Sequence, residues 1–172
     1  MSTVNIVNEL LAELSAQPRQ AQGNQLGQEL VLDEDGYLAL DFAGRLSITL
    51  FCPANSDRLV LYSGLLALPA RNEAAAPLLR ELLRQNMPEM LHTDERLALE
   101  GDTVYLVLEK TVDAQANRLT AAELHSLLLS FAADADSLAL ALREYAAASS
   151  APAASQGAGG WAQYEQPFLI RV

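Results

Sequence analysis

The stretch that decides the fold runs from Glu29 to Tyr62 and reads ELVLDEDGYLALDFAGRLSITLFCPANSDRLVLY. Short apolar runs alternate in it with clusters of Gly, Asp, Asn and Pro. Such runs between turn-forming residues are typical of antiparallel strands joined by tight turns. We therefore expect three or four short strands here, with residues 30–32 leading into a hairpin turn at Asp33–Gly36.

Helical patterns lie on both sides of these strands. From about Thr3 to Ala16, apolar residues recur every three or four positions, and Ser2 or Thr3 can cap this helix. A second helix is expected over 72–86. Because proline is well tolerated in the first turn, Pro77 favours a regular helix that starts at the proline.

The last part of the chain adds a hairpin and a long helix. Strands are expected over 96–100 and 103–110, joined through Gly101. Thr120 and Glu123 form a capping box, which predicts a helix from there to about residue 148. The sequence thus predicts an α+β fold, in which an antiparallel twisted sheet of five or six strands is combined with three helices.

The charge of the chain restricts its partners. Among 172 residues, 22 are acidic and 11 are basic, so the net charge is −11. Binding to nucleic acid or to an anionic membrane needs many Lys and Arg side chains, and neither partner is expected here. The charge serves either solubility alone or an acidic surface that receives a basic or unfolded partner.

Cys52 is the only cysteine, which excludes a disulfide within the chain and suits a reducing compartment. Its place in the strand pattern makes it a core thiol. The first residues do not read as a secretory signal, and no uninterrupted apolar run approaches the roughly 18 residues of a membrane span. We expect a soluble, cytoplasmic protein.

No motif of enzyme chemistry is visible. The two histidines, His92 and His125, lack companions at metal-ligand spacing, and Asp33–Gly36 lacks the later ligands of a calcium loop. Neither a nucleophile elbow nor a phosphate-binding loop is present. The sequence predicts no metal, no cofactor and no catalytic residues.

The strands have two faces of different character. Leucines and isoleucine gather on one face, which is the expected core. The opposite face carries Tyr37, Phe51, Val60 and Tyr62 beside polar residues, and Tyr105 of the later hairpin adds to it. A second face that is half apolar is either covered by one of the chain's own helices or used to bind a partner.

The helix over 72–86 holds a compact set of leucines: Leu78, Leu79, Leu82 and Leu83. These leucines either pack on the sheet in the ordinary way or form a seam between two copies of the chain.

Beyond the long helix the composition changes twice. We divide the chain into a domain over 1–148, a flexible Ala/Ser/Gly linker over 149–160 and an apolar tail over 161–172. The tail is aromatic and aliphatic, and its expected docking residues are Trp161, Tyr164, Phe168 and Ile170. It can dock on its own domain, on a second copy, or on a partner as an added strand.

The order of elements, and the local sequence at 30–36, 46–50 and 57–62, resemble a known family. The likeness is to the class I type III secretion chaperones, the Tir chaperone (CesT-like) family, over about residues 3–148.

The resemblance implies a homodimer without enzymatic activity or ATP use, in the bacterial cytosol. Such a dimer binds the N-terminal region of a secreted effector and keeps it soluble and competent for secretion. The four leucines of the second helix match the dimerisation helix. Val4, Val7 and Leu11 of the first helix match the effector-binding surface, together with Phe51, Val60 and Tyr62.

The tail departs from compact members of the family, and it could imitate an effector segment. Three alternatives stay open. The chain can be a regulatory chaperone, which exchanges a secreted protein for an anti-activator and so controls secretion genes. It can also be a small ligand-binding protein or enzyme that uses the half-apolar face, or an adaptor that never releases its client.

Overall fold

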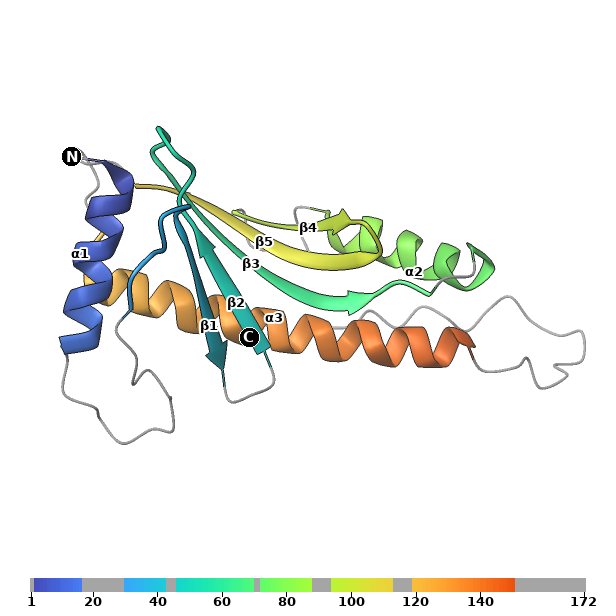
Figure 1. Ribbon diagram of the computed structural model, residues 1–172. Helices are drawn as coiled ribbons and strands as arrows, with labels where there is room; N and C mark the ends of the chain where they lie inside the picture. The colour runs from blue at the N-terminus through green and yellow to red at the C-terminus, as the bar shows by residue number, and fades with distance from the viewer. Residues whose placement is uncertain are drawn as a thin grey trace, which may run out of the picture.

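The structure is a computed structural model that describes residues 2–16, 30–42, 46–69, 72–87, 94–112 and 119–150. In these residues three helices and five strands follow one another along the chain (Figure 1). Their bounds are α1 Thr3–Ala16, β1 Tyr37–Phe42, β2 Leu46–Phe51, β3 Arg58–Ala67, α2 Asn72–Gln85, β4 Glu95–Glu100, β5 Thr103–Thr111 and α3 Ala121–Ser150.

The five strands form one antiparallel sheet in the order β1-β2-β3-β5-β4. The prediction of an α+β fold with three helices and five or six strands is therefore confirmed, with five strands. The long strands β3 and β5 occupy the centre, and β1 and β4 are the two edges.

Residues 30–32, the place for a fourth strand in the stretch before Tyr62, do not form one. This segment is extended, but it hydrogen-bonds to α1 instead of joining the sheet. The Leu32 amide donates to Asn8 Oδ1 at 2.9 Å, and the Leu30 amide donates to Ser15 Oγ at 3.4 Å. Leu30 and Leu32 themselves are buried in the core. Polar side chains of the helix thus satisfy the backbone groups that a neighbouring strand would otherwise pair.

The helix α1 matches its prediction. Ser2 caps it, because its carbonyl accepts from the Ile6 amide at 3.2 Å and its hydroxyl from the Asn5 amide at 3.4 Å. The capping box of α3 is also confirmed: the Thr120 amide donates to Glu123 Oε2 at 2.8 Å, and the Glu123 amide donates to Thr120 Oγ1 at 3.2 Å.

The second helix matches its expected range of 72–86, since α2 runs from Asn72 to Gln85, but the regular helix does not start at Pro77, which lies inside it. A proline at this place removes one hydrogen bond close to the helix start. The burial of Leu78 and Leu82 in the core holds the helix in place nonetheless.

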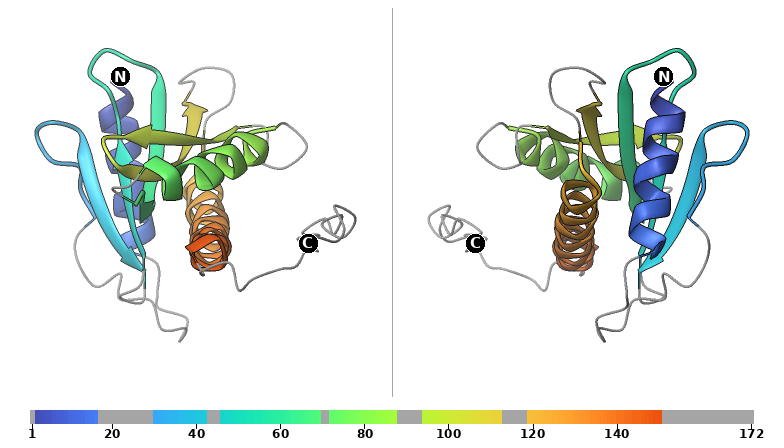
Figure 2. Two further views of the ribbon diagram at one scale, coloured as in Figure 1. Left: turned by 90° about the vertical axis from the view of Figure 1, so that its right-hand side faces the viewer. Right: turned by 90° about the vertical axis from the view of Figure 1, so that its left-hand side faces the viewer.

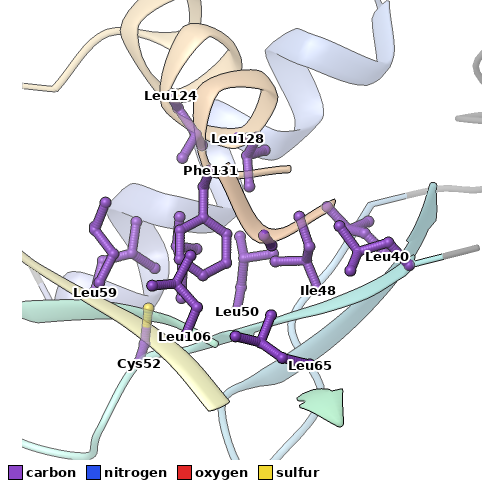
Figure 3. Close-up of a cluster of buried hydrophobic side chains, with 14 of the residues drawn as sticks. Leu40, Ile48, Leu50, Cys52, Leu59, Leu65, Leu106, Leu124, Leu128 and Phe131 are labelled. Carbon is purple, nitrogen blue, oxygen red and sulfur yellow. The ribbon is translucent and has the colours of Figure 1, made fainter. Parts of the chain in front are cut away.

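The hydrophobic core lies between the helices and one face of the sheet, which we call the inner face. Buried residues of all three helices belong to a single cluster with inner-face residues of the strands. Phe131, Leu124 and Leu128 of α3 point onto Ile48 and Leu50 in its centre (Figure 3). The helix α3 runs along the length of the sheet, with α1 at one end of it and α2 at the other (Figures 1 and 2).

By length and composition alone, α3 between Ala121 and Ala148 would also suit a membrane span. In this structure its apolar stripe packs in the core, and Asp136 in the middle of the helix is exposed. Both features are those of a core helix.

Candidate functional site

The face of the sheet turned away from the helices, which we call the outer face, carries rows of apolar side chains. The strand register places Tyr37, Phe51 and Val60 side by side across β1, β2 and β3. The next row contains Tyr62 and Val107, and the third contains Tyr105 opposite Gly64. None of the outer-face residues is buried by the part of the chain that the structure describes.

The aromatic rings of the outer face are ordered in two pairs. Tyr37 stacks on Phe51 with ring centroids 4.2 Å apart, and Tyr62 meets Tyr105 edge-on at 6.0 Å. Partial burial raises the pKa of the Tyr62 hydroxyl, which is therefore neutral at physiological pH. A half-apolar second face is either covered by one of the chain's own helices or used to bind a partner. Cover by a described helix is excluded, since all three described helices contribute to the core on the inner side.

Three charged residues border the aromatic rows. Arg58 of β3 and Arg96 of β4 both pair with Glu109 of β5, the latter at 3.1 Å, and both arginines are more than half exposed. The hydrogen bonds from Arg58 and then Arg96 lower the pKa of Glu109. Two arginines therefore share one carboxylate at this border.

Sequence reasoning did not single out this charged border. Each of the three residues lies an even number of positions from an apolar outer-face residue of its own strand or pairs with one across the sheet. Strand parity was therefore a signal that could have found them.

The candidate residues of α1 lie mostly inside the protein. Val7 and Leu11 have no exposed surface and belong to the core, whereas Val4 is partly exposed. A partner can therefore touch Val4, but it cannot reach Val7 or Leu11 without opening the core.

The leucines of α2 divide into two sets. Leu78 and Leu82 are buried in the core of the protomer. Leu79 and Leu83 are 36% and 73% exposed, and Met87, one turn further on, is 52% exposed. Leu79 and Leu83 lie on the same face of α2 because they are four positions apart. Together with Met87, two residues beyond the end of the helix at Gln85, they make up what we call the α2 ridge.

The described residues contain no group of His, Cys, Asp or Glu side chains that could hold a metal ion. His92 lies outside the described residues, and His125 is a single, partly buried residue on α3. Cys52 is buried, as predicted for a core thiol, and burial raises its pKa to about 11. The thiol is therefore protonated and unreactive at neutral pH.

The predicted tail residues Trp161, Tyr164, Phe168 and Ile170 lie outside the described residues, as does the linker apart from the last two residues of α3.

Comparison with known proteins assigns this chain to a family. The sequence profile of the Tir chaperone protein (CesT) family matches residues 20–139. A comparison with curated proteins gives no significant match.

Two solved structures share the fold. The ExsC–ExsE complex aligns with a TM-score of 0.63 at 23% identity, over 90% of this chain and all of the other. The HopA1–SchA chaperone–effector complex aligns with a TM-score of 0.54 at 19% identity, over 81% of this chain and 94% of the other.

A helix-backed sheet whose second face is half apolar and aromatic is the architecture that this family match places among the secretion chaperones. The chain belongs to the Tir chaperone protein (CesT) family and is a type III secretion chaperone. The family is one of chaperones and not of enzymes.

Proposed function

We propose that the protein works as an ATP-independent homodimer in the bacterial cytosol and holds the N-terminal region of a secreted effector in a soluble, partly unfolded form. The observation that carries the proposal is the open outer face of the sheet, where ordered aromatic side chains lie uncovered by any described element. Exposed apolar surface of this kind is typical of a site for another polypeptide.

The outer face suits an extended client. Apolar side chains of a client can pack on the rows headed by Tyr37, Phe51 and Tyr62. The neighbouring strand β1 pairs only with β2 and leaves one edge of the sheet for an added strand. Arg58 and Arg96 at the border favour clients that carry a carboxylate beside their apolar residues.

The α2 ridge supports the dimer. Its three residues are large, apolar and exposed, whereas their neighbours Leu78 and Leu82 are already used in the core. Two copies that meet through this ridge would remove it from water, and the outer faces of both protomers would stay available.

Binding alone is sufficient for this function. The sequence offers no phosphate-binding loop for a nucleotide. Release of the client would then need no nucleotide hydrolysis by this chain.

The client-binding proposal is tested by purification of the protein from its own cytosol and native mass spectrometry of the complex. Phe51→Ser and Tyr62→Ser should lose the bound polypeptide, whereas Ser47→Ala, an exposed position on the same face, should retain it. The bound polypeptide should be an exported protein. Deletion of its N-terminal region should abolish its binding to the chaperone. Retention of the client by both face variants would refute the proposed site, and a bound anti-activator would favour the regulatory alternative.

The dimer is tested by light scattering on a sizing column. The wild-type mass should be about 37 kDa, twice the 18.5 kDa of the chain. Leu83→Asp should give the monomer mass, whereas Leu140→Asp, at an exposed leucine of α3, should leave the dimer intact. A dimer in Leu83→Asp would exclude the α2 ridge as the interface.

A further inference from the structure

The tail over 161–172 has the sequence pattern of a one-sided extended segment. Its even-numbered residues Tyr164, Phe168, Ile170 and Val172 are apolar, with Gln166 as the single polar member. The odd-numbered positions hold Gln163, Glu165, Pro167 and Arg171, together with the apolar Trp161 and Leu169. In an extended chain, alternate residues point to one side, so this segment would present one apolar strip.

Pro167 determines how such a segment can bind. A proline has no amide hydrogen and disturbs pairing in a strand. Docking by side chains onto the face of a sheet therefore suits the tail better than hydrogen bonding along a sheet edge. The outer face offers apolar rows at every second residue of a strand, about 6.6 Å apart, which is also the spacing of the tail's apolar residues when extended.

The end of α3 lies within reach of this face. Arg143 Nη2 donates to the carbonyl of Leu65 at 3.4 Å, so this part of α3 lies against β3. Both elements run in the same direction (Figure 1). Ser150, the last residue of α3, is about 10 Å further along the helix, and Tyr62 is about 10 Å back along the strand from Leu65.

The linker is long enough to join the two places. Residues 151–160 can span about 33–36 Å when fully extended. Their root-mean-square length as a flexible chain is about 16–19 Å. The tail can thus pass around the end of the sheet and reach Tyr105 and Tyr62 from the outer side.

The charge of the tail agrees with this position. Glu165 and Arg171 cancel, so residues 151–172 carry no net side-chain charge, although the whole chain has a charge of −11. The segment is therefore not repelled by the acidic domain, as most other parts of the chain would be.

We propose that residues 161–172 dock on the outer face of the sheet of the same protomer, over Tyr105, Tyr62 and Phe51, and occupy it as an internal pseudo-client. The proposal concerns the face that the proposed function gives to the client, and its regulatory meaning rests on that function. A client must displace the tail before it binds. The empty chaperone meanwhile keeps its aromatic side chains covered.

Tethering makes a weak contact effective. Flexible linkers of this length give effective concentrations on the order of 1 mM. A tail whose separate peptide binds with a Kd of ~0.1 mM would then be docked about ten times as often as it is free. Removal of the tail from the face should therefore raise the affinity for a competing peptide about tenfold.

The only tryptophan of the chain, Trp161, reports directly on docking. In the full chain its emission should lie at shorter wavelength than in the synthetic peptide 161–172, and acrylamide should quench it several-fold less. Tyr62→Ser and Phe51→Ser should each shift the emission and the quenching toward the values of the free peptide. Ser47→Ala should change neither.

A second measurement uses fluorescein-labelled peptide 161–172 as the competing ligand. Its anisotropy titration should give about tenfold tighter binding to a full chain that carries Phe168→Ser and Ile170→Ser than to the wild type. Addition of Tyr62→Ser to that variant should abolish binding. Equal affinities for the wild type and the tail variant would overturn the proposal.

The choice of occupant is tested with Leu83→Asp, which leaves the outer face intact. Protection of Trp161 should persist in this variant and should not depend on protein concentration. Loss of protection would place the tail on the α2 ridge or on a second copy and would overturn docking within one protomer. No client enters these experiments, so a protected Trp161 in a protein that never binds an effector would refute the proposed function and leave the tail docking in place.

Discussion

Replacement of Gly36 by alanine should destabilise the protein because of one close approach. Gly36 ends the turn before β1 with a φ of +85°, and a Cβ atom there would lie 2.6 Å from the carbonyl oxygen of Cys52. The Gly36 carbonyl also accepts from the Cys52 amide at 2.9 Å. An added methyl group would therefore push apart two segments that a hydrogen bond holds together.

Both contributions can be given a magnitude. A left-handed backbone costs an ordinary L-residue about 1–2 kcal/mol. Relief of the clash lengthens the Gly36–Cys52 hydrogen bond, whose loss costs about 1 kcal/mol. Gly36→Ala should thus lower the free energy of unfolding by about 2–3 kcal/mol. Since this bond joins the start of β1 to the end of β2, the variant should also disturb the stacking of Tyr37 on Phe51.

Gly101 provides a matched control. It also has a left-handed backbone, with a φ of +60°, but an added Cβ would meet nothing within 4 Å. Gly101→Ala should cost only the backbone term of about 1–2 kcal/mol. Urea unfolding followed by far-ultraviolet circular dichroism measures both. Equal losses in the two variants would refute the role of the Cys52 carbonyl.

Three further predictions concern single side chains. Thr120→Ala removes the capping hydroxyl of α3 and should cost about 1 kcal/mol in urea unfolding, whereas Thr120→Ser should cost little. Asn86→Ala removes two hydrogen bonds to the backbone of Leu97, at 2.6 and 2.9 Å; it should cost about 1–3 kcal/mol, and an unchanged midpoint would exclude this role. Cys52 should resist iodoacetamide in the native protein at pH 8 and react fully in urea, since its pKa is raised from 9.0 to about 11. Because the unfolded thiol ionises first, its contribution to stability is complete below pH 9 and declines as the pH rises toward 11, and Cys52→Ala should remove this part of the pH dependence.

Local rules were sufficient where a short pattern fixes a structure. The Thr120–Glu123 capping box could be read from four residues, and the cap of α1 could be narrowed to Ser2 or Thr3, because these hydrogen bonds join near neighbours. Strand parity separated Leu50 from Phe51 and so predicted the outer face correctly. The same rule also predicted a buried Cys52.

The features that the sequence did not show depend on contacts between distant segments. Residues 30–32 have the composition of a strand, and only the side chains of Asn8 and Ser15 explain why they join the helix instead. Val7 and Leu11 belong to the apolar stripe of α1, and no local signal says which part of a stripe is left exposed. Leu78 is buried and Leu83 is exposed, and this difference likewise depends on where α2 lies in the complete fold.

The hydrogen bonds of Asn86 have a consequence for the sheet as a whole. On the edge strand β4, the Leu97 amide donates to Asn86 Oδ1, and the Leu97 carbonyl accepts from Asn86 Nδ2. One side chain thus takes both outward backbone groups of Leu97. At the start of the other edge strand, β1, Asp33 does the same for Tyr37, whose amide donates to Asp33 Oδ1 and whose carbonyl accepts from the Asp33 amide, both at 2.8 Å. Sheets polymerise when both edges are free. Each edge is therefore interrupted at one residue, which shortens the run of free backbone groups on which a second sheet could pair, while residues 38–42 of β1 can still accept a short added strand.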